Sequence, residues 1–242
     1  MPQDPSTTRR AGHSVARWTI CLLLACLALE AATITFGVSD RGGLVRLAAG
    51  GALLPDEAAA TAARDRALVL LKLVLFTGAG IAWLLWVHRT YGNLSLVGSK
   101  RSRFTRRWAV SYWFIPLINL VRAYQVMKDL WLRSDSLNDR DAYDRLPAPA
   151  YLTGWWGLSV TRAVLGVPIT LMARDARTHI ELINATDLGM LVNAVGVIAG
   201  VLAIKVVREI DRRQQCFELS PTQQPAAVPQ RRAGASAGLK TY

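Results

Sequence analysis

Four long runs of mostly apolar residues constrain this chain more than any other feature. They cover about residues 18–38, 67–86, 154–173 and 188–207. A helix of about 20 residues, rising about 1.5 Å per residue, spans the roughly 30 Å hydrocarbon core of a bilayer. Hydrophobic residues make up 52% of the chain and are concentrated in these runs. The pattern predicts an all-α integral membrane protein with four transmembrane helices.

The first run has an alternative interpretation as a cleaved signal peptide. Its Leu-Leu-Ala-Cys sequence, ending at Cys26, resembles a lipoprotein cleavage site. The apolar run continues to Val38, however, where a lipoprotein would turn polar. We therefore expect this run to remain in the protein as a span.

A fifth apolar stretch, residues 106–133, decides the topology. If it stays on one side, four spans with both termini inside place far more Lys and Arg on the inner side than on the outer. If it crosses, five spans with the N-terminus inside place more of them outside, against the positive-inside rule. The composition, rich in Arg, Ala, Leu and Gly, is typical of a GC-rich bacterial genome. The sequence thus predicts a multi-pass protein of the bacterial cytoplasmic (inner) membrane with both termini cytoplasmic.

The same stretch predicts a proline-broken interfacial amphipathic helix over about residues 105–134. Pro116 has no N–H and interrupts a helix, and Asn119 or water is expected to bind the carbonyl that it frees. Residues 108–115 are apolar nearly all round, and either dip into the bilayer or pack under the bundle. Polar residues such as Arg122 alternate with an apolar stripe, a pattern typical of helices in the membrane interface. The stripe consists of Leu117, Leu120, Val121, Tyr124, Met127 and Trp131.

The chain divides into three parts by composition. We predict a cytoplasmic N-terminal tail (1–17), a membrane helical domain (18–219) and a disordered cytoplasmic tail (220–242) rich in Pro, Gln, Ala, Gly and Ser. Within the fourth run, Gly196 and Gly200 form a pair of small residues that favours close helix packing, within the chain rather than between copies.

At the residues around the broken helix, the chain resembles the domain of unknown function family 4328, a group of bacterial multi-span membrane proteins. The resemblance covers about residues 67–215 and departs at Ala123, where proline is expected in many members. It implies a membrane location and a fold type, and brings no established activity or catalytic residues. The similarity rests chiefly on Arg89, Asn93, Trp108, Trp113, Pro116, Asn119, Trp155 and Trp156.

Three ionisable residues lie inside the predicted spans, where a charge is costly and often functional. Glu30 and Lys72 differ in depth by a few residues, which allows a pair, and Arg162 near mid-membrane also reaches the level of Glu30. One interpretation is a proton or ion relay; the other is a structural ion pair. The sequence favours the structural pair, because a single acid is a thin basis for a relay.

Basic residues on the predicted cytoplasmic face are candidates for binding anionic lipid, each contributing about 1 kcal/mol near the surface. The Asp-rich run at 135–144 lacks the glycine and closing glutamate of an EF-hand loop, so we predict a solvated loop rather than a calcium site. The lipid candidates are Lys100, Arg101, Arg103, Arg106, Arg107, Arg122 and Lys128.

No motif of a known catalytic, cofactor or metal site occurs in the chain. We therefore predict no catalytic residues, no cofactor, no metal and no nucleic-acid partner. The favoured function is a non-enzymatic membrane module that binds anionic lipid, a protein partner or a second copy of the chain in a homo-oligomer. The alternative is a small oligomeric transporter or channel that uses Glu30.

Overall fold

The structure, a computed structural model, describes residues 5–52, 54–96, 104–134 and 147–218. These residues form helices and no strand. The elements in chain order are α1 (Pro5–Ala48), α2 (Pro55–Leu96), α3 (Arg106–Ser111), the 3-10 turn η1 (Tyr112–Phe114), α4 (Pro116–Arg133), α5 (Ala150–Asp175) and α6 (His179–Glu218).

Four of these helices, α1, α2, α5 and α6, are long and apolar enough to cross a membrane. This confirms the predicted all-α fold with four span-length helices. Three of the four continue well beyond the predicted spans: α1 has 44 residues, about 66 Å of helix, against a hydrocarbon core of roughly 30 Å. Helix α2 begins at Pro55, followed by Asp56 and Glu57, whose negative charges are favourable at a helix N-terminus.

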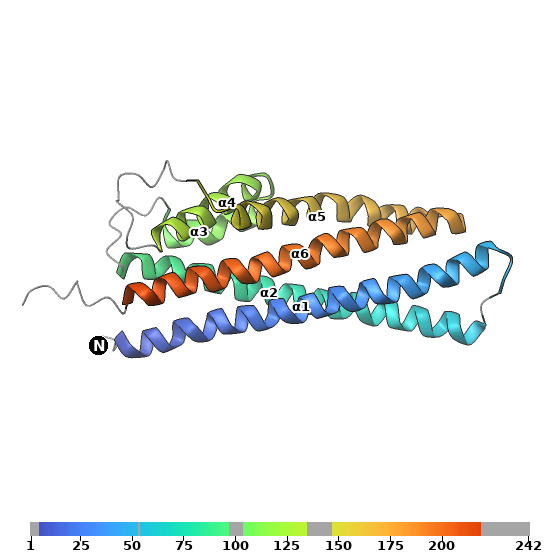
Figure 1. Ribbon diagram of the computed structural model, residues 1–242, viewed down its shortest axis with the longest axis horizontal. Helices are drawn as coiled ribbons and strands as arrows, with labels where there is room; N and C mark the ends of the chain where they lie inside the picture. Colours follow the sequence, from blue (N-terminus) through green and yellow to red (C-terminus); the bar gives the residue numbers. More distant parts are fainter. Residues whose placement is uncertain (1–4, 53, 97–103, 135–146, 219–242) are drawn as a thin grey trace, which may run out of the picture.

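The long helices form two hairpins that turn at the same end of the bundle, α1–α2 and α5–α6 (Figure 1). We call this the hairpin end; the opposite end, where α1 begins and α6 finishes, is the terminal end, and it also holds α3 and α4. Helix α1 packs against α2 and α6, and α6 packs against α5, whereas the contact between α2 and α5 is much weaker. The bundle is therefore least closed between α2 and α5.

A glycine of the predicted small-residue pair lies at the α1–α6 contact. A Cβ atom added to Gly200 would come within 2.6 Å of Leu27 Cδ2. That distance is too short for a real contact, so a larger residue at this position would require the Leu27 side chain to shift.

The stretch between α2 and α5 is divided into two helices rather than forming one. Helix α3 is capped by Thr105, whose hydroxyl accepts a hydrogen bond from the Trp108 N–H. Ile115 is extended (φ −99°, ψ 108°), and Pro116 starts α4 at a position where a missing N–H costs nothing. The Asn119 side-chain amide donates to the Trp113 carbonyl (3.2 Å), which the break leaves without a helical partner. In the described part of the chain, this region contains no fifth helix of spanning length.

Helix α4 packs on the bundle through a face that differs from the predicted stripe. The packed residues are spaced as one face of a helix, whereas Leu117, Leu120 and Val121 of the predicted stripe are exposed. Met127 belongs to both sets. Apolar residues thus occupy two sides of α4, one covered by the bundle and one left open. The fully buried set is Ala123, Val126, Met127 and Leu130.

A packed cluster at the terminal end contains five tryptophans: Trp83, Trp86, Trp113, Trp155 and Trp156. Trp83 lies at the centre, with its ring 5.1 Å from that of Trp155 and 6.0 Å from that of Trp113. Among the described residues, the indole N–H groups of Trp83, Trp86 and Trp113 find no hydrogen-bond acceptor, so ring packing holds the cluster together. Trp108, in contrast, is exposed.

Candidate functional site

An exposed apolar surface surrounds the break between η1 and α4. Leu117 is 82% exposed and Phe114 is 71% exposed, although both are large hydrophobic side chains. Contiguous exposed apolar surface commonly marks a membrane or protein contact. We call this surface the apolar patch; it consists of Phe114, Ile115, Leu117, Ile118, Leu120 and Val121.

Basic side chains lie on α3, which precedes the apolar patch in the chain, and on α4. Arg106, Arg107 and Arg122 are exposed, and Lys128 is half-buried on α4. The Arg106 guanidinium lies against Gly92 of α2, where an added Cβ would come within 2.0 Å of it. Gly92 is therefore the residue that lets Arg106 lie flat on α2. The other three lipid candidates, Lys100, Arg101 and Arg103, lie outside the described residues.

The C-terminal half of α4 is fixed to α2 by a buried polar network. The Tyr91 hydroxyl donates to Asp129 of α4, and Arg133 Nε donates to the other oxygen of the same carboxylate at 2.6 Å. The Phe104 N–H donates to the Tyr91 oxygen (3.2 Å), which connects the residues just before α3 to the same network. Burial, followed by the Asp129 charge, raises the pKa of Tyr91, so this hydroxyl remains a donor.

Helix α6 joins the same region through a buried glutamine. Gln214 Nε2 donates to the Thr90 carbonyl of α2 at 3.2 Å, and lies 3.4 Å from the Ser134 hydroxyl at the end of α4. Buried polar groups of this kind fix the relative position of the helices that they join, because leaving one unpaired is costly.

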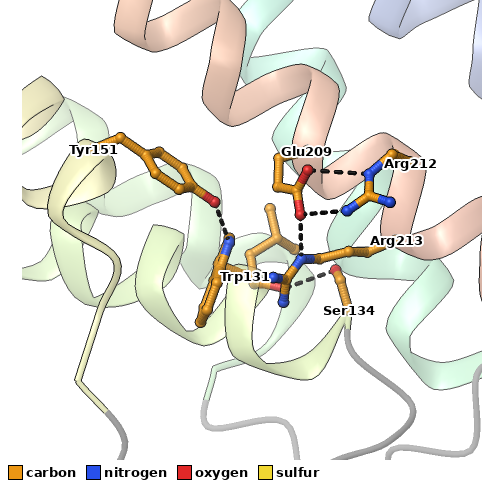
Figure 2. A network of polar contacts seen from close by, with 7 residues as sticks. Trp131, Ser134, Tyr151, Glu209, Arg212 and Arg213 are labelled. Atoms are coloured by element: carbon orange, nitrogen blue, oxygen red, sulfur yellow. Dashed lines mark hydrogen bonds and ion pairs between the residues drawn. The ribbon is translucent and has the colours of Figure 1, made fainter.

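A second network, at the end of α4, joins α5 and α6 (Figure 2). Trp131 Nε1 donates to the Tyr151 hydroxyl of α5 at 2.6 Å, and the Arg213 guanidinium of α6 lies 4.0 Å from the centre of the Trp131 ring. Glu209 accepts hydrogen bonds from Arg212 and Arg213, which hold the pKa of its carboxyl below the usual value. The far half of α4 is thus attached to three long helices, whereas the apolar patch at its near half is open.

The structure also brings together the three charges predicted inside the spans. Glu30 is only 2% exposed, and its carboxylate contacts Arg162 through one oxygen and Lys72 (3.6 Å) through the other. The Arg162 guanidinium also lies 4.9 Å from the centre of the Phe76 ring. We call Glu30, Lys72 and Arg162 the charge cluster. Glu30 therefore forms an ion pair with both Lys72 and Arg162, rather than with one of them.

The family-motif residues mostly lie around the broken helix. Trp113 and Trp156 stack edge to face at 6.0 Å, and the Trp156 indole donates to the Leu120 carbonyl at 3.0 Å, so two motif tryptophans support the break directly. Of the remaining motif residues, Trp155 is buried and Asn93 half-buried, while Arg89 is exposed on α2.

Several residues of these networks were not predicted as site residues from the sequence. Tyr91 and Gln214 gave no sequence signal, because their roles depend on contacts between helices. Asp129 was recognisable, since Arg133 follows it by four residues on the same helical face. The described residues contain no group of three His, Cys, Asp or Glu that could hold a metal, and the Asp-rich run at 135–144 lies outside them.

Four span-length helices with a broken helix at one end define an all-α protein of the multi-span membrane type. The model of one family matches residues 49–212, about two thirds of the chain. The chain belongs to this family, which is described as Domain of unknown function (DUF4328). No curated protein and no solved structure matches the chain.

Proposed function

We propose that this protein is a non-enzymatic module of the bacterial cytoplasmic membrane that binds anionic lipid through the face made by α3, η1 and the first half of α4. The exposed apolar patch supports the proposal, because exposed arginines lie on the helices on either side of the break that it surrounds: Arg106 and Arg107 on α3, and Arg122 on α4. Apolar side chains enter the acyl region while cations remain at the headgroups, so such a face suits the surface of an anionic leaflet. A protein partner or a second copy of the chain is the other occupant that this face could accept.

The orientation proposed for the chain follows from this lipid contact. The positive-inside rule favours the terminal end, with both termini, on the cytoplasmic side. The apolar patch then lies at the level of the inner leaflet, with the attached half of α4 running along the bundle. Neither a cofactor nor nucleic acid enters the proposal.

Depth measurements test the apolar patch. Single spin-labelled cysteines are placed at Leu117 and at Arg122 after Cys21, Cys26 and Cys216 are replaced by alanine. In nanodiscs, the Leu117 label should be accessible to oxygen and protected from a water-soluble nickel chelate, and the Arg122 label should show the reverse. Equal nickel access at both positions would place the patch in water and contradict the proposal.

Lipid selectivity tests the role of the three exposed arginines on this face. Replacing Arg106, Arg107 and Arg122 by glutamine should reduce the anionic lipid that co-purifies with the protein at least twofold, because each cation contributes about 1 kcal/mol at the surface. Exposed arginines away from this face provide a matched triple control: Arg46, Arg66 and Arg174, also changed to glutamine. An equal loss in both triple variants would show that total charge, and not this face, selects the lipid.

A small oligomeric transporter or channel is the second candidate. The observation that favours it is the burial of Glu30, whose Oε2 accepts no hydrogen bond from any described residue and contacts Lys72 only at ion-pair distance. Against it, both oxygens of Glu30 face a cation, which is the arrangement of a structural ion cluster. The Glu30→Gln variant distinguishes a transporter from a structural ion cluster.

A further inference from the structure

A cavity of about 700 Å³ opens between α2 and α5, in the half of the bundle nearer the hairpin end. Helix α6 contributes Gly189, Val192 and Asn193 to its wall. It lies where the contact between α2 and α5 is weakest. A second cavity of about 230 Å³, on the side of the terminal end, shares Phe76, Ser159 and Arg162 with it and contains Glu30. The charge cluster therefore lies at the junction of two cavities.

The charge cluster carries a surplus positive charge. Glu30 supplies one negative charge, while Arg162 and Lys72 supply two positive charges, and both bases line the larger cavity. An unmatched charge inside a spanning helix is costly. A bound anion would remove this cost, so the cavity favours a negatively charged ligand.

Hydrogen-bond donors are available for such a ligand. A guanidinium has five N–H groups, and Arg162 makes one hydrogen bond, to Glu30. Its position is set by Gly196 of α6, where an added Cβ would lie 2.9 Å from the guanidinium. Asn193, in the wall of the cavity, has a side-chain amide without a hydrogen-bond partner among the described residues.

Much of the remaining cavity wall is apolar, although Ser159 and Thr170 also line it. Val167 and Leu171 line it, and these side chains are 64% and 51% exposed. A small hydrated anion gains nothing from such a wall, whereas an acyl chain does.

We propose that the cavity binds an anionic amphiphile, an acyl chain that carries a carboxylate or phosphate head. The head pairs with Arg162 and Lys72 and accepts from the Asn193 amide, and the chain lies along Val167 and Leu171. This site is separate from the apolar patch, so its test and the tests of the proposed function succeed or fail independently.

Binding to the purified wild-type protein in a neutral detergent tests the proposal. The probes are oleate, dioleoyl phosphatidic acid, oleyl alcohol and inorganic phosphate. We expect saturable binding of oleate or phosphatidic acid at least tenfold tighter than that of oleyl alcohol, and none of phosphate at the same concentrations. The two acids distinguish a carboxylate head from a phosphate head. Equal binding of the alcohol, or of phosphate alone, would overturn the proposal without the use of any variant.

Two variants locate the ligand. Lys72→Met removes the surplus charge and leaves the Glu30–Arg162 pair neutral, so the protein should fold while affinity for the acid falls at least tenfold. The control is Lys205→Met, a lysine on α6 that lies over the Tyr151 ring and does not line the cavity. Gly196→Ala should also weaken binding, because its methyl group displaces the guanidinium, whereas Gly157→Ala has open space and should not. Unchanged affinity in both Lys72→Met and Gly196→Ala would overturn the assignment to this cavity.

Discussion

The terminal end and the charge cluster contain buried ionic groups in contrasting arrangements. At the terminal end, Asp129 accepts hydrogen bonds from Tyr91 and Arg133. The Tyr91 oxygen in turn accepts a hydrogen bond from the backbone N–H of Phe104. In the charge cluster, one carboxylate faces two cations beside an open cavity. A network whose groups are all paired serves to fix helices, whereas a surplus charge beside a cavity provides a means of binding a ligand. The first arrangement fixes α4 on the bundle, and the second lies beside the cavity in which we propose that a ligand binds.

The largest effect is expected when the charge cluster loses its acid. Glu30→Gln leaves Arg162 and Lys72 without a counter-charge, and removing one partner of a buried ion pair costs about 3–5 kcal/mol. We expect a strong loss of abundance and of heat-resistant folded protein, measured by size-exclusion chromatography after heating. Asp65→Asn, at an exposed acid, is the matched control and should have little effect.

A second change distinguishes structure from transport at the charge cluster. Adding Arg162→Gln to Glu30→Gln restores the net charge of the native cluster and should recover part of the lost stability. A Glu30→Gln protein of normal abundance that had lost a wild-type proton or cation flux in vesicles would instead favour the transporter.

A smaller effect is expected at the terminal end. Asp129→Asn weakens the bonds to Tyr91 and Arg133, at a cost of about 1.5–3 kcal/mol, because hydrogen bonds to charged groups are worth about that much. Since the network joins α4 to α2, hydrogen exchange should accelerate over residues 104–134. Gln125→Ala, at a surface contact with Arg122, is the control. Acceleration spread over the whole bundle would contradict the local role given to this network.

The smallest expected effect is at the surface of the same end. Glu209→Gln removes the ion pairs with Arg212 and Arg213. Because both pairs are partly exposed, the free energy of unfolding should fall by less than about 1 kcal/mol. The pKa of Glu209 is lowered in the folded protein, so its contribution is present above the usual carboxyl pKa and is lost as pH falls through the lowered value. The difference in thermal midpoint between wild type and variant should therefore shrink on acidification. A difference independent of pH would show that the ion pairs contribute nothing.

Much of the fold was predictable because it depends on properties of single segments. The length of the apolar runs predicts four spanning helices, and Pro116 with the extended Ile115 before it explains why α3 and α4 are separate. Helix α2 begins at Pro55, where Asp56 and Glu57 favour a helix start well before the apolar run. None of these features requires knowledge of which helices are neighbours.

The buried face of α4 was less predictable from its pattern. Its apolar residues occupy two sides, and periodicity alone does not say which side the bundle covers. The structure covers Ala123 and Val126 and exposes Leu117 and Val121. The small Ala123 suits the packed side, which is a signal that the predicted stripe did not use.

The sequence by itself determined four span-length helices, a helix break at Pro116 and three charges at similar depths in the predicted spans. Depth follows from counting residues along a helix, because each one adds a fixed rise. Only the tertiary structure decided that Glu30 faces both Lys72 and Arg162, that Gly196 positions Arg162, and that a cavity opens beside them. These contacts depend on how each helix is rotated and which helices adjoin, and packing across the whole bundle sets both.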